Sequence, residues 1–163
     1  MEEYFDVVDE NDNVTGKATR SECHSNPDLI HRGVHIWIEN DEGRLLLQKR
    51  SMEKDLYKGM WIDSASGHVE SEQEYEEAAH RELMEELGIE TDLKRIGKIF
   101  HKGIETEFIM IFRGKHNGPF KCPKEEIDYV RFFTIDEIKK MMETHPEDFC
   151  PVTLASFRKL LSD

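Results

Sequence analysis

Residues 67–89 read GHVESEQEYEEAAHRELMEELGI, and the fold that the sequence predicts depends mainly on these positions. Ser71 and Glu74 have the spacing of a capping box, so a helix is expected to begin at Ser71. Gly88 is expected to end this helix after about four turns, because glycine readily adopts the left-handed conformation of a C-terminal cap. Between positions 70 and 90 there are nine acidic residues and one arginine, Arg81. These features predict a capped and strongly acidic helix.

Three glutamates of the expected helix are placed where they can act together. Glu82 and Glu86 are one turn apart on one side of the helix, and Glu85 lies beside them. Like charges at this spacing destabilise an isolated helix, so the cluster favours a bound cation that compensates them. Carboxylate oxygens with room for water are ligands that suit Mg²⁺ or Mn²⁺. The alternative is a solvated acidic face, which is the usual role of such a helix.

The sequence as a whole predicts a single α+β domain over residues 1–163, because a chain of this length usually builds one core. Several strands interrupted by one long helix, with further helices near the C-terminus, indicate a mixed sheet. The expected strands are Tyr4–Val8, Val34–Ile38, Leu45–Gln48, Trp61–Ser66, Leu93–His101, Glu107–Phe112 and Tyr129–Phe133.

Three shorter helices complete the expected elements. One lies within residues 18–30 and is followed by a turn at Pro27. Thr134 and Glu137 form a second capping box, which predicts a helix that continues to about Met142. Pro151 is expected at the start of the last helix, because proline fits the first helical position.

The composition excludes several classes of protein. Hydrophobic residues make up 37% and charged residues 35%, and the formal net charge is −13, which disfavours nucleic acid and anionic membranes as partners. No apolar run approaches the ~20 residues of a membrane-spanning helix, and the N-terminus lacks the pattern of a signal peptide. Cys23, Cys122 and Cys150 cannot all pair and form no CxxC motif, so a reducing, cytoplasmic location is expected.

The spacing of glycine, arginine and glutamate across residues 67–89 resembles the Nudix box, with one departure: Gln73 stands where the family has glutamate. The resemblance implies a Nudix fold, which is an α/β/α sandwich with a central mixed β-sheet. It also implies a small-molecule diphosphate substrate held by Mg²⁺ or Mn²⁺. In this reading the metal ligands or the catalytic base are Glu82, Glu85 and Glu86. Arg81 orients these carboxylates, and the Gly67 backbone lies close to the metal.

Within this superfamily the chain is similar to the branch of type I isopentenyl-diphosphate isomerase. Five residues match the metal ligands of the isomerase, namely His24, His31, His68, Glu105 and Glu107. Arg50 and Lys54 match its diphosphate-binding residues. Residues 61–68 are similar to the segment that carries the isomerase cysteine, but this chain has Ser66 at that position. A hydroxyl is far less acidic than a thiol, so Ser66 argues against isomerisation.

Individual residues also have simpler interpretations. His24 would be solvated in a loop, His31 would cap a strand and His68 would bond to a turn. Arg50 and Lys54 would be surface charges. Glu125 and Glu126 could supply a distal general base, although an exposed acidic loop is the simpler reading.

Three functions therefore stay open. The first is a metal-dependent hydrolase that cleaves the diphosphate linkage of a nucleoside diphosphate joined to a group X. The second is an isomerase-like enzyme, and the third is a non-catalytic diphosphate-binding module, for which Gln73 is the support. A homodimer is also open, because the segments around Phe120 and Phe149 could form an interface or belong to the core.

Overall fold

A computed structural model describes residues 2–161, and along these residues nine strands form one sheet. The strands are β1 Tyr4–Val8, β2 Val14–Thr19, β3 Ile30–Glu39, β4 Leu45–Arg50, β5 Trp61–Ile62, β6 Ala65–His68, β7 Lys94–Lys102, β8 Thr106–Lys115 and β9 Ile127–Phe133. The helices are α1 Arg20–Ser25, α2 Tyr75–Leu87, α3 Ile135–Thr144 and α4 Pro151–Leu160, with a short 3₁₀ helix, η1, at Pro146–Asp148. No helix of the described residues is both long and apolar enough to cross a membrane.

The sheet is mixed, as the sequence predicts, and it is organised around β3. This strand pairs antiparallel with β1, β4 and β6 and parallel with β8 along its whole length. The parallel register places His31 opposite Glu107, and the antiparallel register places His35 opposite Ser66. Because all four partners meet on one strand, residues that are far apart in the sequence come together beside β3.

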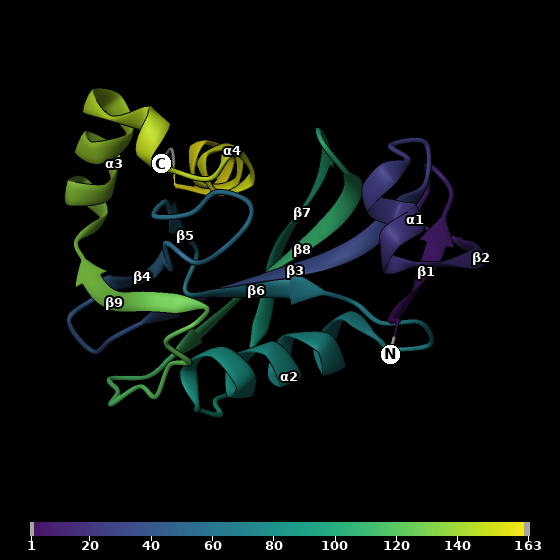
Figure 1. Ribbon diagram of the computed structural model, residues 1–163. Coiled ribbons are helices and arrows are strands. Elements are labelled where there is room, and N and C mark those ends of the chain that lie inside the picture. Colours follow the sequence, from purple (N-terminus) through teal and green to yellow (C-terminus); the bar gives the residue numbers. More distant parts are fainter. Residues whose placement is uncertain (1, 162–163) are drawn as a thin grey trace.

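Helices cover both faces of the sheet, so the α/β/α sandwich implied by the resemblance is confirmed (Figure 1). Alternate residues of β3 point to opposite faces, as in any strand. Val34, Ile36 and Ile38 pack toward α2. Trp37 packs on the other face, where Phe157 of α4 contacts it edge-on with ring centroids 5.1 Å apart.

The β1–β2 hairpin and α1 lie together at one end of the sheet (Figure 1). Asp12, in the hairpin turn, has a φ of 63° and a side chain only 7% exposed. Its carboxylate accepts hydrogen bonds from Arg32 of β3 at 2.7 Å, Tyr75 of α2 at 2.7 Å and Lys98 of β7 at 3.0 Å. One carboxylate thus joins the hairpin to the sheet and to α2.

The predicted start of the long helix at Ser71 is wrong. The helix begins at Tyr75, and Glu74 and Glu77 form the capping box. The Ser71 hydroxyl donates instead to Asp6 of β1 at 2.8 Å, so a contact with a distant strand takes the group that the local pattern assigned to the cap. The predicted end is confirmed, because Gly88 has a φ of 66° and its N–H bonds to the carbonyl of Met84.

Other boundaries differ in smaller ways. Strand β2 was not predicted, since only Ala18 of its residues is buried and the strand shows no apolar alternation. The helix expected within residues 18–30 is limited to α1, and the strand expected over Trp61–Ser66 is divided into β5 and β6. The capping box of Thr134 and the helix start at Pro151 are confirmed.

Candidate active site

Glu82 and Glu86 of α2 lie against β6, where a glycine makes room for them. A Cβ atom on Gly67 would overlap the carboxyl group of Glu82. Glu86 is held from two sides, since its Oε1 accepts a hydrogen bond from the Ser66 N–H at 2.9 Å and from Gln48 Nε2 at 3.2 Å. Helix and strand therefore fix two of the three predicted carboxylates close to the backbone of Gly67.

These two carboxyl groups are costly to ionise without a cation. Burial raises the pKa of Glu82 to about 7, although the Arg81 guanidinium acts against the shift. Burial and the neighbouring Glu82 raise the pKa of Glu86 to about 8. Two adjacent carboxyl groups that resist ionisation suit a site in which a divalent cation replaces their protons. The residues present thus fit the Mg²⁺ or Mn²⁺ that the acidic pattern of the sequence predicts.

Arg81 connects the acidic helix to the preceding loop. Its Nη1 donates to Glu82 at 2.6 Å and lies 3.5 Å from Glu85, whose side chain is 59% exposed. Its Nη2 donates to the carbonyl of His68 at 2.8 Å and to Oε1 of Gln73 at 3.2 Å. The amide oxygen of Gln73 accepts from Arg81 as a carboxylate oxygen would, so the departure from the Nudix pattern preserves this contact.

A second group of candidate ligands meets on the other side of β6. One ligand atom from each of His24, His31, His68 and Glu105 lies within 4.8 Å of the others. The carboxylate of Glu105 is 2.8 Å from His24 Nε2 and 3.2 Å from His68 Nε2. His31 Nε2 lies 3.7 Å from Glu105, which is too long for a hydrogen bond. The structure thus brings together four of the five residues that match the isomerase ligands.

The donor set of this histidine cluster fits a divalent cation. His31 is fully buried, and neither of its ring nitrogens has a hydrogen-bond partner among the described residues. Burial lowers the pKa of His24 and of His68, which favours the neutral imidazole that binds metals. Although burial opposes it, contacts with His31 and His68 hold the pKa of Glu105 below its usual range. Three imidazole nitrogens and one carboxylate around a common point are typical metal ligands.

Glu107, the fifth matched residue, lies beside this cluster rather than within it. It is 8% exposed, and its carboxyl group occupies the space that a Cβ atom on Gly33 would need. Burial and the neighbouring Glu105 raise its pKa well above the usual value. Both effects act against ionisation of this carboxyl group.

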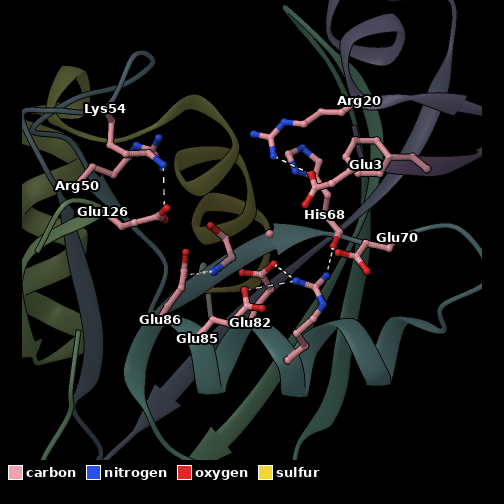
Figure 2. A pocket seen from close by; sticks show the side chains of 14 residues that line it. Glu3, Arg20, Arg50, Lys54, His68, Glu70, Glu82, Glu85, Glu86 and Glu126 are labelled. Carbon is pink, nitrogen blue, oxygen red and sulfur yellow. Dashed lines mark hydrogen bonds and ion pairs between the residues drawn. The ribbon is translucent and has the colours of Figure 1, made fainter. Parts of the chain in front are cut away.

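Two cavities flank β6, and Ser66, Gly67 and His68 line both. The first, which we call the carboxylate cavity, has a volume of about 320 Å³. Its lining includes Glu82, Glu85 and Glu86, which we call the α2 glutamates (Figure 2). The second, which we call the histidine cavity, has a volume of about 190 Å³ and is lined by residues of the histidine cluster and by Glu107. The segment Ser66–His68 thus forms a shared wall.

The two predicted diphosphate-binding cations face the α2 glutamates across the carboxylate cavity (Figure 2). Arg50 lines both cavities, and its Nε donates to the carbonyl of Leu56 at 3.1 Å. Lys54 pairs with Glu126 at 3.5 Å. Glu126 lines the carboxylate cavity with a side chain 45% exposed, so this residue of the acidic loop does reach the site.

Gln48 and His35 are among the residues at the site that sequence reasoning missed. Gln48 supports Glu86, and no local pattern marks it. His35 lines the histidine cavity, and its spacing from His31 is the signal that could have found it, because alternate residues of a strand share a face.

The comparison with protein families agrees with this geometry. The model of the NUDIX domain matches residues 29–152. The chain belongs to the Nudix family. This Nudix chain is 32% identical to an uncharacterized Nudix hydrolase of Pseudomonas aeruginosa, over 94% of its own length and 90% of the relative. It is 27% identical to isopentenyl-diphosphate Delta-isomerase 2 of Photorhabdus laumondii, over 99% of its length and 92% of the relative.

Solved structures support the fold of this Nudix protein. The crystal structure of DR0079 from Deinococcus radiodurans superposes with a TM-score of 0.84 at 22% identity, covering 97% of this chain and 99% of that one. The MutT protein of Methanosarcina mazei superposes with a TM-score of 0.69 at 21% identity, covering 82% and 94%. These similarities show the Nudix fold, whereas the hydrolase and isomerase relatives leave the reaction to be tested.

Proposed function

We propose that this Nudix protein is a Mg²⁺- or Mn²⁺-dependent hydrolase that cleaves the diphosphate linkage of a nucleoside diphosphate joined to a group X. The observation that carries the proposal is the placement of Glu82 and Glu86, two buried carboxyl groups held against Gly67 beside a cavity with basic residues on its far side. The three unpaired cysteines agree with a reducing, cytoplasmic location.

In this proposal each residue has a separate task. Glu82, Glu85 and Glu86 would hold the cation, which when bound would neutralise diphosphate oxygens and acidify a water. One of these carboxylates takes a proton from the water as the water oxygen forms a bond to phosphorus and the bridging P–O bond of the diphosphate breaks, so that the second phosphate leaves with the electron pair of that bond. Arg81 orients Glu82, and the Ser66 N–H orients Glu86. Arg50 and Lys54 attract the diphosphate across the cavity.

The test is phosphate or phosphomonoester release from a panel of nucleoside diphosphate derivatives and other diphosphate esters with Mn²⁺. The proposal expects turnover by the native protein and a large loss in Glu86→Gln. Glu76→Gln is the matched control, because Glu76 lies on the same helix but pairs with Arg95 away from the cavity. Equal rates in all three proteins would show that the released phosphate does not come from this site.

An isomerase-like reaction is the second candidate, and the histidine cluster is the observation that favours it. Ser66 opposes it, because a serine hydroxyl does not ionise at neutral pH. The contact of Gln73 with Arg81 weakens the support for a non-catalytic module, since this departure leaves the site assembled.

A further inference from the structure

His35 lines the site but belongs to neither group of candidate metal ligands. It lies on the same face of β3 as His31 and Trp37, because these residues alternate with Val34 and Ile36, which pack toward α2. Its side chain is 10% exposed and lines the histidine cavity.

A buried carboxylate holds one edge of the His35 ring. Asp63 is fully buried, and its Oδ1 lies 2.7 Å from His35 Nδ1. Thr153 Oγ1 donates to Oδ1 at 2.6 Å and Trp37 Nε1 donates to Oδ2 at 2.6 Å, so neutral donors already reach both oxygens. Burial opposes ionisation, but His35 and these donors hold the pKa of Asp63 below its usual value. An ionised carboxylate accepts hydrogen bonds, so Nδ1 carries the proton of this contact.

The other ring nitrogen is then free to contact a ligand. A neutral imidazole that donates from Nδ1 has a lone pair on Nε2. Among residues 2–161 no hydrogen bond is made to His35 Nε2. The network therefore presents an acceptor, fixed in tautomer and orientation by Asp63, at the wall of the histidine cavity.

The rest of the cavity shows what kind of group this acceptor would meet. Aliphatic side chains line the cavity, namely Leu56, Ile62, Ile104 and Val152. Leu56 and Ile104 are 47% and 58% exposed and both line the cavity, so an aliphatic group bound there would cover them. A volume of about 190 Å³ is below the roughly 300 Å³ at which pockets for drug-sized ligands begin. The cavity thus fits a short carbon chain rather than a whole nucleoside.

We propose that His35 is a specificity-determining residue whose Nε2 accepts a hydrogen bond from a hydroxyl group on a short aliphatic group X bound in the histidine cavity. This inference rests on the proposed function, in which the diphosphate lies at the shared wall Ser66–His68 and X extends to the histidine side. An X without a donor would leave the buried acceptor unpaired, and such a loss discriminates strongly between substrates.

The test compares two substrates that differ by one oxygen atom, the butyl and the 4-hydroxybutyl esters of ADP, with Mg²⁺ at about pH 8, which is above the reference pKa of about 6.5 for a free histidine side chain. The native protein is expected to favour the hydroxylated ester by about tenfold in kcat/KM. His35→Asn keeps a donor toward Asp63 but has no nitrogen at the Nε2 position. It should bring the ratio to about one at an unchanged thermal midpoint. His145→Asn, the same change at an exposed histidine, should keep the native ratio.

An independent measurement is the ¹⁵N spectrum of the imidazole groups, which should show His35 protonated at Nδ1 and not at Nε2. A proton on Nε2 overturns the assignment. Hydrolysis of both esters at equal rates, unchanged by His35→Asn, overturns it as well while the proposed hydrolase stands. If neither ester is hydrolysed but the hydroxylated one raises the midpoint of the native protein and not of His35→Asn, His35 keeps its role and the nucleotide panel decides the hydrolase proposal. If neither ester is hydrolysed and neither raises the midpoint, the assignment to His35 is overturned, whatever the panel shows.

Discussion

Glu86 combines burial, two accepted hydrogen bonds and a neighbouring carboxyl group, so it is the residue at which the hydrolase proposal makes its sharpest prediction. Glu86→Gln retains the shape of the side chain and removes the charge. The rate on a proven substrate should fall by about 10²–10⁴-fold, which is typical when a ligand or base is lost. Steady-state kinetics with saturating Mn²⁺ measure this, and turnover close to native would contradict the role of Glu86.

The same substitution makes a separate prediction about stability without metal. Because the pKa of Glu86 is raised to about 8, the native state keeps a proton that the unfolded state releases from about pH 4 upward. The contribution of protonated Glu86 to the free energy of unfolding is complete below the unfolded pKa and is lost as pH rises through about 8. Glu86→Gln should therefore match the native midpoint near pH 4 and exceed it increasingly toward about pH 8. Thermal scans with a chelator would show a constant difference if Glu86 were not shifted.

Ser66 separates the two candidate reactions. The native protein should exchange no deuterium into isopentenyl diphosphate, because a serine hydroxyl does not supply the proton that a thiol of pKa near 8.5 can. Ser66→Cys should recover at most a trace, and only if the histidine cluster is loaded with metal. Mass spectrometry of the substrate after incubation in D₂O measures both. Efficient exchange by the native chain would replace the hydrolase proposal with the isomerase one.

At the scale of elements, the contacts of Asp12 join the β1–β2 hairpin to β3, β7 and α2. Burial acts to raise the pKa of Asp12, but hydrogen bonds from Arg32, Tyr75 and Lys98 outweigh it and keep the pKa low. Asp12→Asn should cost about 1–3 kcal/mol at neutral pH. Asparagine tolerates a positive φ, so the loss of stability measures the removal of the charge and not backbone strain.

The pH dependence of this loss follows from the direction of the pKa shift. A carboxylate with a lowered pKa stabilises the native state above its unfolded pKa, and the contribution disappears as pH falls through the folded pKa. The difference between Asp12→Asn and the native protein should therefore shrink below about pH 4. Asp128→Asn, at an exposed aspartate, is the control and should be neutral in denaturant titrations at every pH.

Sequence patterns predicted the helix ends correctly where the capping group bonds to a residue nearby in the sequence. Thr134 caps α3 through Glu137, and Gly88 ends α2, as expected. Ser71 failed because Asp6, distant in sequence, takes its hydroxyl. The candidate site shows the same contrast between residues that are close in the sequence and residues that are distant. One helix carries the α2 glutamates, so their spacing alone predicts that they lie together. The histidine cluster was expected only from a resemblance, since its residues come from four separate segments.

At the scale of the whole molecule, two groups of candidate ligands lie on opposite sides of β6 in a chain of net charge −13. We expect calorimetric titration with Mn²⁺ to show two classes of site and the thermal midpoint to rise with the cation by mass action. Glu86→Gln should remove one class, and His24→Gln the other. His145→Gln should keep both. A single class that both substitutions abolish together would show that the clusters act as one centre.

The alternation along β3 also bears on how such a chain could change its specificity. His35 lines the histidine cavity and Gly33 makes room for Glu107, which also lines it, whereas Val34 and Ile36 pack toward α2, which carries Glu82 and Glu86. Substitution of His35 leaves Val34 and Ile36 in place, because neighbouring residues of a strand point to opposite faces. Recognition of the organic group and assembly of the hydrolytic centre therefore depend on alternate positions of one strand. A lineage could change a residue that faces the histidine cavity, such as His35, and acquire a new substrate while the glutamates of the hydrolytic centre keep their positions.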